Sequence, residues 1–258
     1  MVQDSKFLII VGGGKFGKKA LDHAKKHKYT TILIDIDPDC YCAKDTDKTL
    51  NDISELSIRK LSPGKSYFLN QDIEIIYKLL PVLNPEYIIP VVPVHLMAQL
   101  VISLLSENKI KTSPNKGLSE HLNSKGNQEL IISHNSEQGV VYLSHAKIDE
   151  ICPDNCAGPL NYCPNFKRDK DITITQYLKD FYYTNEIFKI EKTEIVNITI
   201  IIESEQLEVG LGGLKGKEIN LLLKELNNNI ELLNTQKCTI IVATTCNCHG
   251  VVNFYGNY

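Results

Sequence analysis

Short apolar runs alternate with amphipathic stretches along the N-terminal part of the chain. Runs rich in β-branched residues predict strands at 7–11, 30–36, 66–69 and 87–92. Apolar residues at helical spacing predict helices from residue 15 onward, at 73–83 and at 95–105. Residues 38–61 lack a clean period and predict a loop with a short helix. Because strands and helices alternate, we expect an α/β fold, with a Rossmann-like parallel sheet over residues 1–112.

The pattern changes after this first domain. Residues 113–127 are polar and contain Pro114, Gly117 and Gly126, which predicts a linker. The remaining sequence predicts a hairpin from 130–132 and 140–143, strands at 195–202 and 239–243, and helices at 177–188 and 217–226. We therefore expect a second, cysteine-containing α/β domain over residues 128–258.

A glycine-rich turn links the first predicted strand to the first predicted helix. Gly12, Gly14 and Gly17 follow the pattern G-x-G-x-x-G. The first glycine permits a tight turn, the second lets the backbone approach a pyrophosphate, and the third allows close packing of helix and strand. Lys15 and Phe16 stand between the last two glycines, where free N–H groups at the helix start attract phosphate. The turn predicts a dinucleotide-binding site that includes all five residues.

Asp35 and Asp37 lie at the C-terminal end of the second predicted strand. Asp35 stands about 20 residues after Gly12, where an acid binds ribose hydroxyls and repels a 2′-phosphate. This favours NAD over NADP, while FAD, another nucleotide or glycines used only for packing remain alternatives. An NTPase loop is disfavoured because Lys19, instead of Ser or Thr, follows Lys18.

The sequences at 9–17 and 34–38, IIVGGGKFG and IDIDP, resemble the NAD(P)-binding domain of potassium-uptake regulators, the TrkA-N or KTN type. They are more distantly similar to the nucleotide-binding end of precorrin-2 dehydrogenases. The resemblance extends to about residue 110, and no family is recognised in the C-terminal half. It implies a Rossmann-like nucleotide-binding domain, which occurs in regulators and in enzymes alike.

His95 follows the strand predicted at 87–92. Ligands of open parallel sheets lie at the C-terminal ends of the strands, so His95 is a candidate catalytic residue. It would act as a proton donor to substrate or as an anchor for the nicotinamide carboxamide. The alternative is a solvent-facing histidine at a helix start.

Cys152, Cys156 and Cys163 form the strongest chemical signal outside the glycine turn. Pro153 and Pro164 directly follow two of them, which indicates a rigid, irregular segment. Such a segment can hold thiolates around a metal, as Cys-Pro steps do in ferredoxin-like loops. These three cysteines would leave one coordination position of a four-ligand metal site unfilled.

Cys246, Cys248 and His249 follow the last predicted strand and are candidates to complete this site. The spacing favours an iron–sulfur cluster, with zinc or ordinary thiols as alternatives, and it matches neither paired C-x-x-C zinc knuckles nor radical-SAM enzymes. Cys238 opens an apolar strand and is expected in the core. Cys40 and Cys42 are expected as loop thiols near the nucleotide.

A second glycine-rich segment, residues 210–216, lies between a predicted strand and a predicted helix. That arrangement can cradle a phosphate or a carboxylate, and it would suit a flavin. The alternative is a mobile surface turn.

Charge and composition exclude several classes of function. The 258 residues carry a net charge of -3, and Arg59 and Arg168 are the arginines, so no nucleic-acid partner is expected. Pro90 and Pro93 interrupt the most apolar stretch, which argues against membrane insertion. The N-terminus lacks the pattern of a secretory leader, so we expect a cytoplasmic protein. In that compartment, eight cysteines point to metal or redox chemistry more than to disulfides.

Two functions fit these features. The first is an NAD(H)-binding oxidoreductase or electron-transfer component with a cysteine-ligated metal centre, acting on a small-molecule substrate or a redox partner protein. Nicotinamide transfers a hydride whereas clusters pass single electrons, so a flavin would lie between them. The alternative is a nucleotide-sensing regulatory protein with a structural or redox-sensing cysteine site. Homodimer formation is compatible with both.

Overall fold

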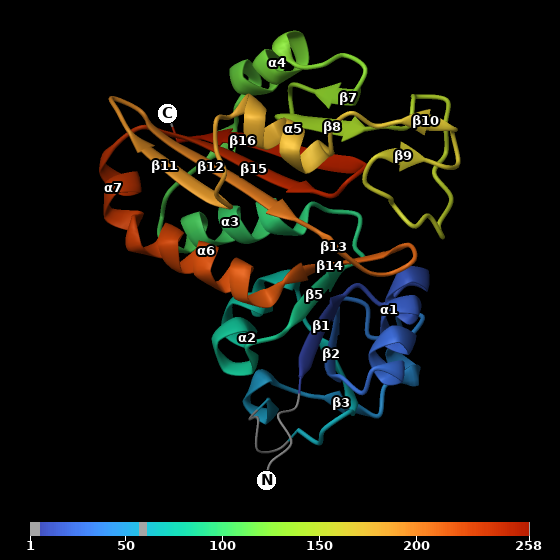
Figure 1. The fold of residues 1–258 in the computed structure, drawn as a ribbon. Helices are drawn as coiled ribbons and strands as arrows, with labels where there is room; N and C mark the ends of the chain where they lie inside the picture. Colours follow the sequence, from blue (N-terminus) through green and yellow to red (C-terminus); the bar gives the residue numbers. More distant parts are fainter. Residues whose placement is uncertain (1–5, 57–60, 258) are drawn as a thin grey trace. The chain divides into compact units, whose positions relative to one another are not determined.

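The computed structural model describes residues 6–56 and 61–257 (Figure 1). The chain divides into an N-terminal unit, Met1–Leu96 with Glu205–Leu221, and a C-terminal unit, Met97–Ser204 with Leu222–Tyr258. The N-terminal sheet is largely parallel and both units mix helices with strands, which confirms the predicted α/β class.

The N-terminal unit is built on a Rossmann-like sheet. In spatial order its strands are β13 (Glu205–Glu208), β14 (Leu211–Lys215), β5 (Tyr87–Pro90), β1 (Phe7–Val11), β2 (Thr30–Asp35), β4 (Ser66–Asn70) and β3 (Lys48–Leu50). The strands from β5 to β3 are parallel, and β14 joins β5 antiparallel. After β1 the chain forms β2 on one side and later β5 on the other. The strand order therefore reverses beside β1.

Helix α1 (Lys15–Lys26) contacts β1 and β2. Its apolar residues Ala20, Leu21 and Ala24 are fully buried against Leu8 and other side chains of the sheet, because they recur at helical spacing on one face.

Helix α2 (Ile76–Leu83) continues the short 3-10 turn Ile73–Ile75, and two further 3-10 turns lie at Ala43–Asp45 and Ile53–Glu55. The expected loop at 38–61 thus contains two 3-10 turns and β3 among its described residues.

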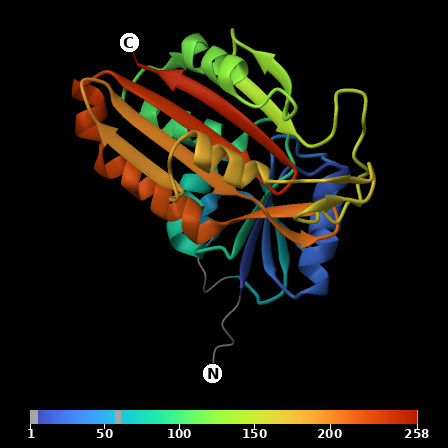
Figure 2. The same cartoon turned by 45° about the horizontal axis from the view of Figure 1, so that its top comes forward.

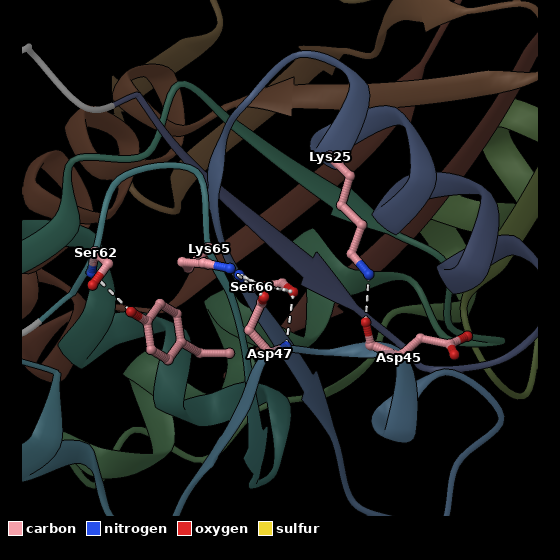
Figure 3. Close-up of polar contacts among 7 residues, drawn as sticks. Lys25, Asp45, Asp47, Ser62, Lys65 and Ser66 are labelled. Carbon is pink, nitrogen blue, oxygen red and sulfur yellow. Dashed lines mark hydrogen bonds and ion pairs between the residues drawn. The ribbon is translucent and has the colours of Figure 1, made fainter.

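Polar contacts fix the connection that leads into β3 at the edge of this sheet. Figure 3 shows the Asp47 carboxylate accepting hydrogen bonds from the Ser66 backbone N–H and hydroxyl, both at 2.8 Å, and pairing with Lys65 at 2.8 Å. In the same view the Lys25 ammonium donates to the Asp45 carbonyl. Asp47 directly precedes β3, so its carboxylate ties the start of that strand to β4.

The glycine-rich segment 210–216, for which the sequence left a phosphate cradle and a mobile surface turn as alternatives, forms mostly a strand. Residues 211–215 are β14, which adds to the N-terminal sheet, and Gly213 and Gly216 are required by close packing. A Cβ atom at Gly213 would lie 2.7 Å from a methyl carbon of Leu207, and one at Gly216 would lie 2.1 Å from the Pro85 carbonyl oxygen. Local sequence could not reveal this role because the strand's partner, β5, is distant in the chain.

The C-terminal unit contains a mostly antiparallel sheet. Its spatial order is β11 (Phe188–Lys192), β12 (Val196–Glu203), β15 (Cys238–Thr245), β16 (His249–Gly256), β8 (Val140–Ser144) and β7 (Ile131–Asn135), with β6 (Ser113–Pro114) also paired to β16. Only the β12–β15 pair is parallel among the described strands of this sheet. The hairpin predicted at 130–143 is confirmed as β7 and β8.

Helices cover this sheet. Figure 2 shows α5 (Ile174–Phe181) over the long strands, and α5 contacts β12 and β16 while α4 (Lys116–Lys125) contacts β7, β8 and β16. The remaining helices are α3 (Leu96–Glu107), α6 (Gly216–Asn228) and α7 (Ile230–Thr235). Among the described residues, no helix is long and apolar enough to cross a membrane.

Two boundaries differ from the sequence predictions. Residues 113–127 hold β6 and α4 inside the C-terminal unit, because the Asn115 side chain caps α4 and Leu122 is fully buried against the sheet. The helix predicted at 177–188 lies at 174–181, where Thr173 supplies the N-cap. Strand β16 was not predicted, although Val252 and Phe254 alternate with polar or less buried residues.

Candidate functional sites

The first candidate site lies at the C-terminal end of β1. The glycine turn leaves β1 there, and the chain segment 91–95 leaves the neighbouring strand β5 on the same edge. In open parallel sheets, this reversal of strand order opens a crevice for a ligand. Half-buried His95 follows β5 directly before α3, so it lies on the edge expected for a catalytic residue.

Two of the three motif glycines are required by the fold itself. Gly12 has φ of +108°, and a Cβ atom added there would lie 2.7 Å from the Val91 carbonyl oxygen. A Cβ atom at Gly17 would lie 2.1 Å from the Gly12 carbonyl oxygen. These glycines therefore let the turn, α1 and the end of β5 approach one another closely.

Gly14 differs from them. An added Cβ atom would meet no atom within 4 Å, and the backbone conformation, φ −78° and ψ −161°, suits any residue. Gly14 is also the N-cap of α1, and no side chain caps this helix end. The space in front of the α1 N-terminus is thus open. Lys15 and Phe16 are exposed beside it, with the Lys15 ammonium 5.6 Å from the Phe16 ring centre.

Asp35 ends β2 next to this turn. Its Oδ2 accepts a hydrogen bond from the Gly13 N–H at 2.5 Å, and its Oδ1 accepts one from the Asp37 N–H at 2.9 Å. Asp35 is half-buried and Asp37 is exposed, with its carboxylate accepting from the Asp39 N–H at 3.0 Å. Each Asp35 oxygen retains lone-pair capacity for a further donor, such as a ribose hydroxyl.

Cys40 and Cys42 pack against the glycine turn at Gly13. Both are buried, although they were predicted as loop thiols, and Cys42 donates to the Gly13 carbonyl from its backbone N–H at 3.0 Å and from its thiol at 3.1 Å. A Cβ atom at Gly13 would lie 2.2 Å from the Cys40 sulfur. Burial raises the pKa of the Cys42 thiol to about 11, so it stays protonated at neutral pH.

The second candidate site joins two segments of the C-terminal unit. One is the cysteine insert, residues 151–170, which contains the short strands β9 (Tyr162–Cys163) and β10 (Arg168–Asp169). The other is the β15–β16 turn, which carries Cys246, Cys248 and His249 between and at the start of the paired strands. The predicted metal-site residues of both segments lie in one region.

Three contacts connect the turn to the insert. The Asn247 amide donates to the Gly158 carbonyl at 2.9 Å, and His249 Nε2 lies 3.4 Å from the Cys152 sulfur. The Lys170 ammonium donates to the Cys248 sulfur at 3.0 Å. Two segments that lie far apart in sequence, each with cysteines, are therefore in contact.

Burial and neighbouring thiols raise the pKa of two cysteines at this site. Burial raises the pKa of the Cys152 thiol, and the charges of Cys156, Cys163 and Cys248 raise it further. The pKa of Cys246 is also raised by burial, and the thiol whose charge acts on it is Cys248.

The remaining cysteine, Cys238, is fully buried at the start of β15, as expected of a core residue, and burial raises its pKa to about 11. Among residues 6–56 and 61–257, no three His, Cys, Asp or Glu side chains are already arranged to hold a metal ion. The thiols of the insert and of the β15–β16 turn would have to move closer together to hold such an ion.

Lys170 was missed by the sequence analysis. It is only 4% exposed, and its ammonium donates to the Pro159 carbonyl as well as to Cys248. It also borders a cavity of about 890 Å³, which His145 and the paired Arg168 and Glu150 line as well. No pattern singles it out from the other lysines of the chain, because its burial depends on the turn that covers it.

Comparisons with known proteins give a family. Residues 7–96 match a model described as the N-terminal domain of an uncharacterized protein, and residues 97–256 match one described as the C-terminal domain. A relative from Archaeoglobus fulgidus, described as an uncharacterized protein, is 30% identical over 244 residues, which cover 95% of this chain and 96% of the relative. No solved structure matches significantly. The boundary between the two matches coincides with the first break between the structural units.

Proposed function

Because this chain belongs to the same two-domain family as the Archaeoglobus fulgidus protein, whose description assigns no activity, we propose a function from the chain's own residues. The proposed protein is an NAD(H)-binding oxidoreductase, or an electron-transfer component of one, with a cysteine-ligated metal centre in its C-terminal unit. A cytoplasmic location belongs to the same proposal. The dinucleotide site is the glycine turn with Asp35 and Asp37.

The observation that carries this proposal is the open space at Gly14. Neither packing nor backbone conformation requires glycine at this position, in contrast to Gly12 and Gly17. The absence of a side chain leaves the N-terminus of α1 accessible, and the positive end of the helix dipole favours a phosphate group. A pyrophosphate there supplies a reason for Gly14 beyond its place as the N-cap of α1.

Asp35 supports the choice of NAD over NADP. Its carboxylate is held in place by the Gly13 and Asp37 N–H groups, so it is positioned before any ligand arrives. A fixed carboxylate binds the ribose hydroxyls of NAD and repels the 2′-phosphate of NADP. His95, at the end of β5, is the residue proposed to donate a proton or to anchor the nicotinamide carboxamide.

The redox part of the proposal has a chemical condition. Nicotinamide exchanges a hydride, so electron transfer to an iron–sulfur cluster requires a flavin or another two-electron carrier between them. Residues 211–215 of the second glycine-rich segment are β14, so they provide no loop for that flavin. A bound flavin would therefore be held by other residues or by a redox partner protein.

Calorimetric titration of NADH into the wild-type protein and the Gly14→Ala variant tests the dinucleotide site. We expect Gly14→Ala to weaken NADH binding at least tenfold, which is about 1.4 kcal/mol, without loss of helical signal. Gly117→Ala is the matched control, because a Cβ atom there meets only the Asn115 side chain at 3.7 Å. Equal NADH affinity in Gly14→Ala and the wild type would overturn the assignment.

A second measurement separates the enzyme from a nucleotide sensor. We expect NADH oxidation by the anaerobically purified protein when an artificial electron acceptor and a flavin are supplied. Tight NADH binding with no oxidation under these conditions would instead identify the regulatory alternative.

A further inference from the structure

The cavity beside Lys170 lies apart from the two sites described above. Its volume is about 890 Å³, and its lining residues come from three segments of the C-terminal unit, 127–132, 145–150 and 166–172. Of the described residues that line it, none is a cysteine or belongs to the glycine turn. Cavities of about 300–1,000 Å³ hold small organic ligands in proteins. This cavity therefore has the size of a binding site for a small metabolite.

The cavity wall combines apolar side chains with an ion pair. Leu130 is buried and Phe166 is half-buried, and both line the cavity. The Arg168 guanidinium pairs with the Glu150 carboxylate, and its central carbon lies 5.1 Å from the centre of the Phe166 ring. The positive charge of Arg168 is therefore neutralised within the protein.

Lys170 is a cation of this wall that lacks such a partner. Its side chain is only 4% exposed, and its ammonium donates to the Pro159 carbonyl and, at 3.0 Å, to the Cys248 sulfur. Among the described residues, no carboxylate pairs with Lys170 and its third N–H has no partner. A buried ammonium is costly unless an anion accompanies it. A carboxylate bound in the cavity would provide that anion.

The remaining charges at the cavity do not replace this anion. Glu129, Asp169 and Asp171 line the cavity but are exposed, as is Lys147. Water and salt screen exposed charges, so these residues contribute little in the buried part. Because Arg168 is paired with Glu150, the buried part carries one uncompensated positive charge. It therefore favours a ligand with a single net negative charge.

His145 adds a hydrogen-bond acceptor to the same cavity. Its Nε2 lies 2.9 Å from the Ile172 carbonyl oxygen. A carbonyl only accepts hydrogen bonds, so Nε2 carries the proton and Nδ1 of the neutral ring carries a lone pair. No described residue donates to Nδ1, and His145 lines the cavity. Nδ1 can therefore accept a hydrogen bond from a hydroxyl group of a ligand.

We propose that this cavity binds a small hydroxycarboxylic acid. Lys170 binds the carboxylate, His145 Nδ1 accepts a hydrogen bond from the hydroxyl group, and Leu130 and Phe166 contact the carbon skeleton. A hydroxy acid carries the single negative charge that the cavity favours, whereas an amino acid of the same size has no net charge. The site requires neither nucleotide nor metal, so it goes beyond the proposed function.

Calorimetric titration of the wild-type full chain with lactate, malate and 3-hydroxybutyrate tests the ligand class. We expect at least one of them to bind with a Kd below about 1 mM, the upper end of usual substrate KM values. Its carboxamide and its analogue without the hydroxyl group should each bind at least about tenfold more weakly, because each loses one hydrogen bond to a buried group. Binding by none of the three acids overturns the proposal, as does equal affinity for the carboxamide. Tighter binding of alanine than of lactate would identify an amino-acid site instead and overturn the charge argument.

Two variants test the residues. Lys170→Met should weaken the acid at least about tenfold, whereas Lys147→Met, the control at an exposed lysine of the same cavity, should change its affinity less than about twofold. His145→Gln keeps a donor for the Ile172 carbonyl but lacks Nδ1, so it should weaken the hydroxy acid and leave its analogue without the hydroxyl group unaffected. Equal losses in the two lysine variants, or equal effects of His145→Gln on both ligands, overturn the residue assignment.

The ligand series on wild-type protein decides the proposal even where a variant fails to fold. The residues of the dinucleotide site belong to the N-terminal unit, so NADH should bind Lys170→Met and His145→Gln as it binds wild type. Loss of hydroxy-acid binding with unchanged NADH affinity thus separates the cavity from the dinucleotide site. Failure of either site leaves the other independently measurable.

Discussion

The carboxylate of Asp35 lies 2.5 Å from the backbone nitrogen of Gly13 and accepts its hydrogen bond. The contact joins the end of β2 to the turn that leaves β1, and Cys42 holds the Gly13 carbonyl on the other side of the same residue. The turn is therefore fixed by contacts within the protein. A preformed turn loses less entropy on binding a ligand than a flexible one.

Replacing Asp35 with Asn removes the charge and keeps an acceptor for one of its two partners, the Gly13 and Asp37 N–H groups. We expect NADH to bind at least tenfold more weakly, and NADPH to lose less, because the repulsion of its 2′-phosphate is also removed. Calorimetry with both nucleotides measures the two effects. Asp39→Asn, at an exposed site nearby, is the control. A larger loss for NADPH than for NADH would place the ribose contact elsewhere, with Asp37 as the next candidate.

Gly17→Ala should destabilise the fold, since the new methyl group would lie 2.1 Å from the Gly12 carbonyl oxygen. We expect a loss of about 1–3 kcal/mol in the free energy of unfolding, the usual range for overpacking. Gly14→Ala should cost less, at most about 1 kcal/mol, because alanine meets no clash there and is only a poorer N-cap than glycine. Urea denaturation of both variants tests the contrast, and similar losses would contradict it.

Cys42 should make stability depend on alkaline pH. Its folded-state pKa, about 11, lies above the ordinary value of 9.0, so the folded protein keeps a proton that the unfolded chain releases in this range. The contribution is fully present below about pH 9 and is lost as pH rises toward about 11, at about 1.4 kcal/mol per pH unit. Cys42→Ala should flatten this part of the curve. Parallel curves for variant and wild type would refute the assignment.

Asp47 should act at the opposite end of the pH range. Its hydrogen bonds and the Lys65 ion pair hold its pKa well below the ordinary value of 3.8. The folded state therefore favours the ionised carboxylate, and this stabilisation is present above about pH 4 and lost as pH falls further. Melting temperatures from pH 5 to pH 2 should fall less steeply for Asp47→Asn. Asp39→Asn should follow the wild type.

Local sequence accounts for the first site. The strand at 7–11, the glycine turn and the helix that begins at Lys15 are contiguous, and their apolar periods are properties of the chain itself. Gly12 and Gly17 are required by contacts within or next to this unit. Asp35 could be assigned because a βαβ unit fixes where its second strand ends. The thiols in positions 152–163 were likewise recognisable from spacing and flanking prolines.

Tertiary structure decided the features that depend on residues distant in sequence. Strand β14 is recognisable only once β5 lies beside it, since its glycines otherwise indicate a loop. The burial of Lys170 and its contact with Cys248 follow from the folding of the insert against the β15–β16 turn. Sequence periodicity records which residues avoid water along one element. The period does not identify the distant element that packs against these residues. Strand partners and buried charges are therefore seen only in the folded chain.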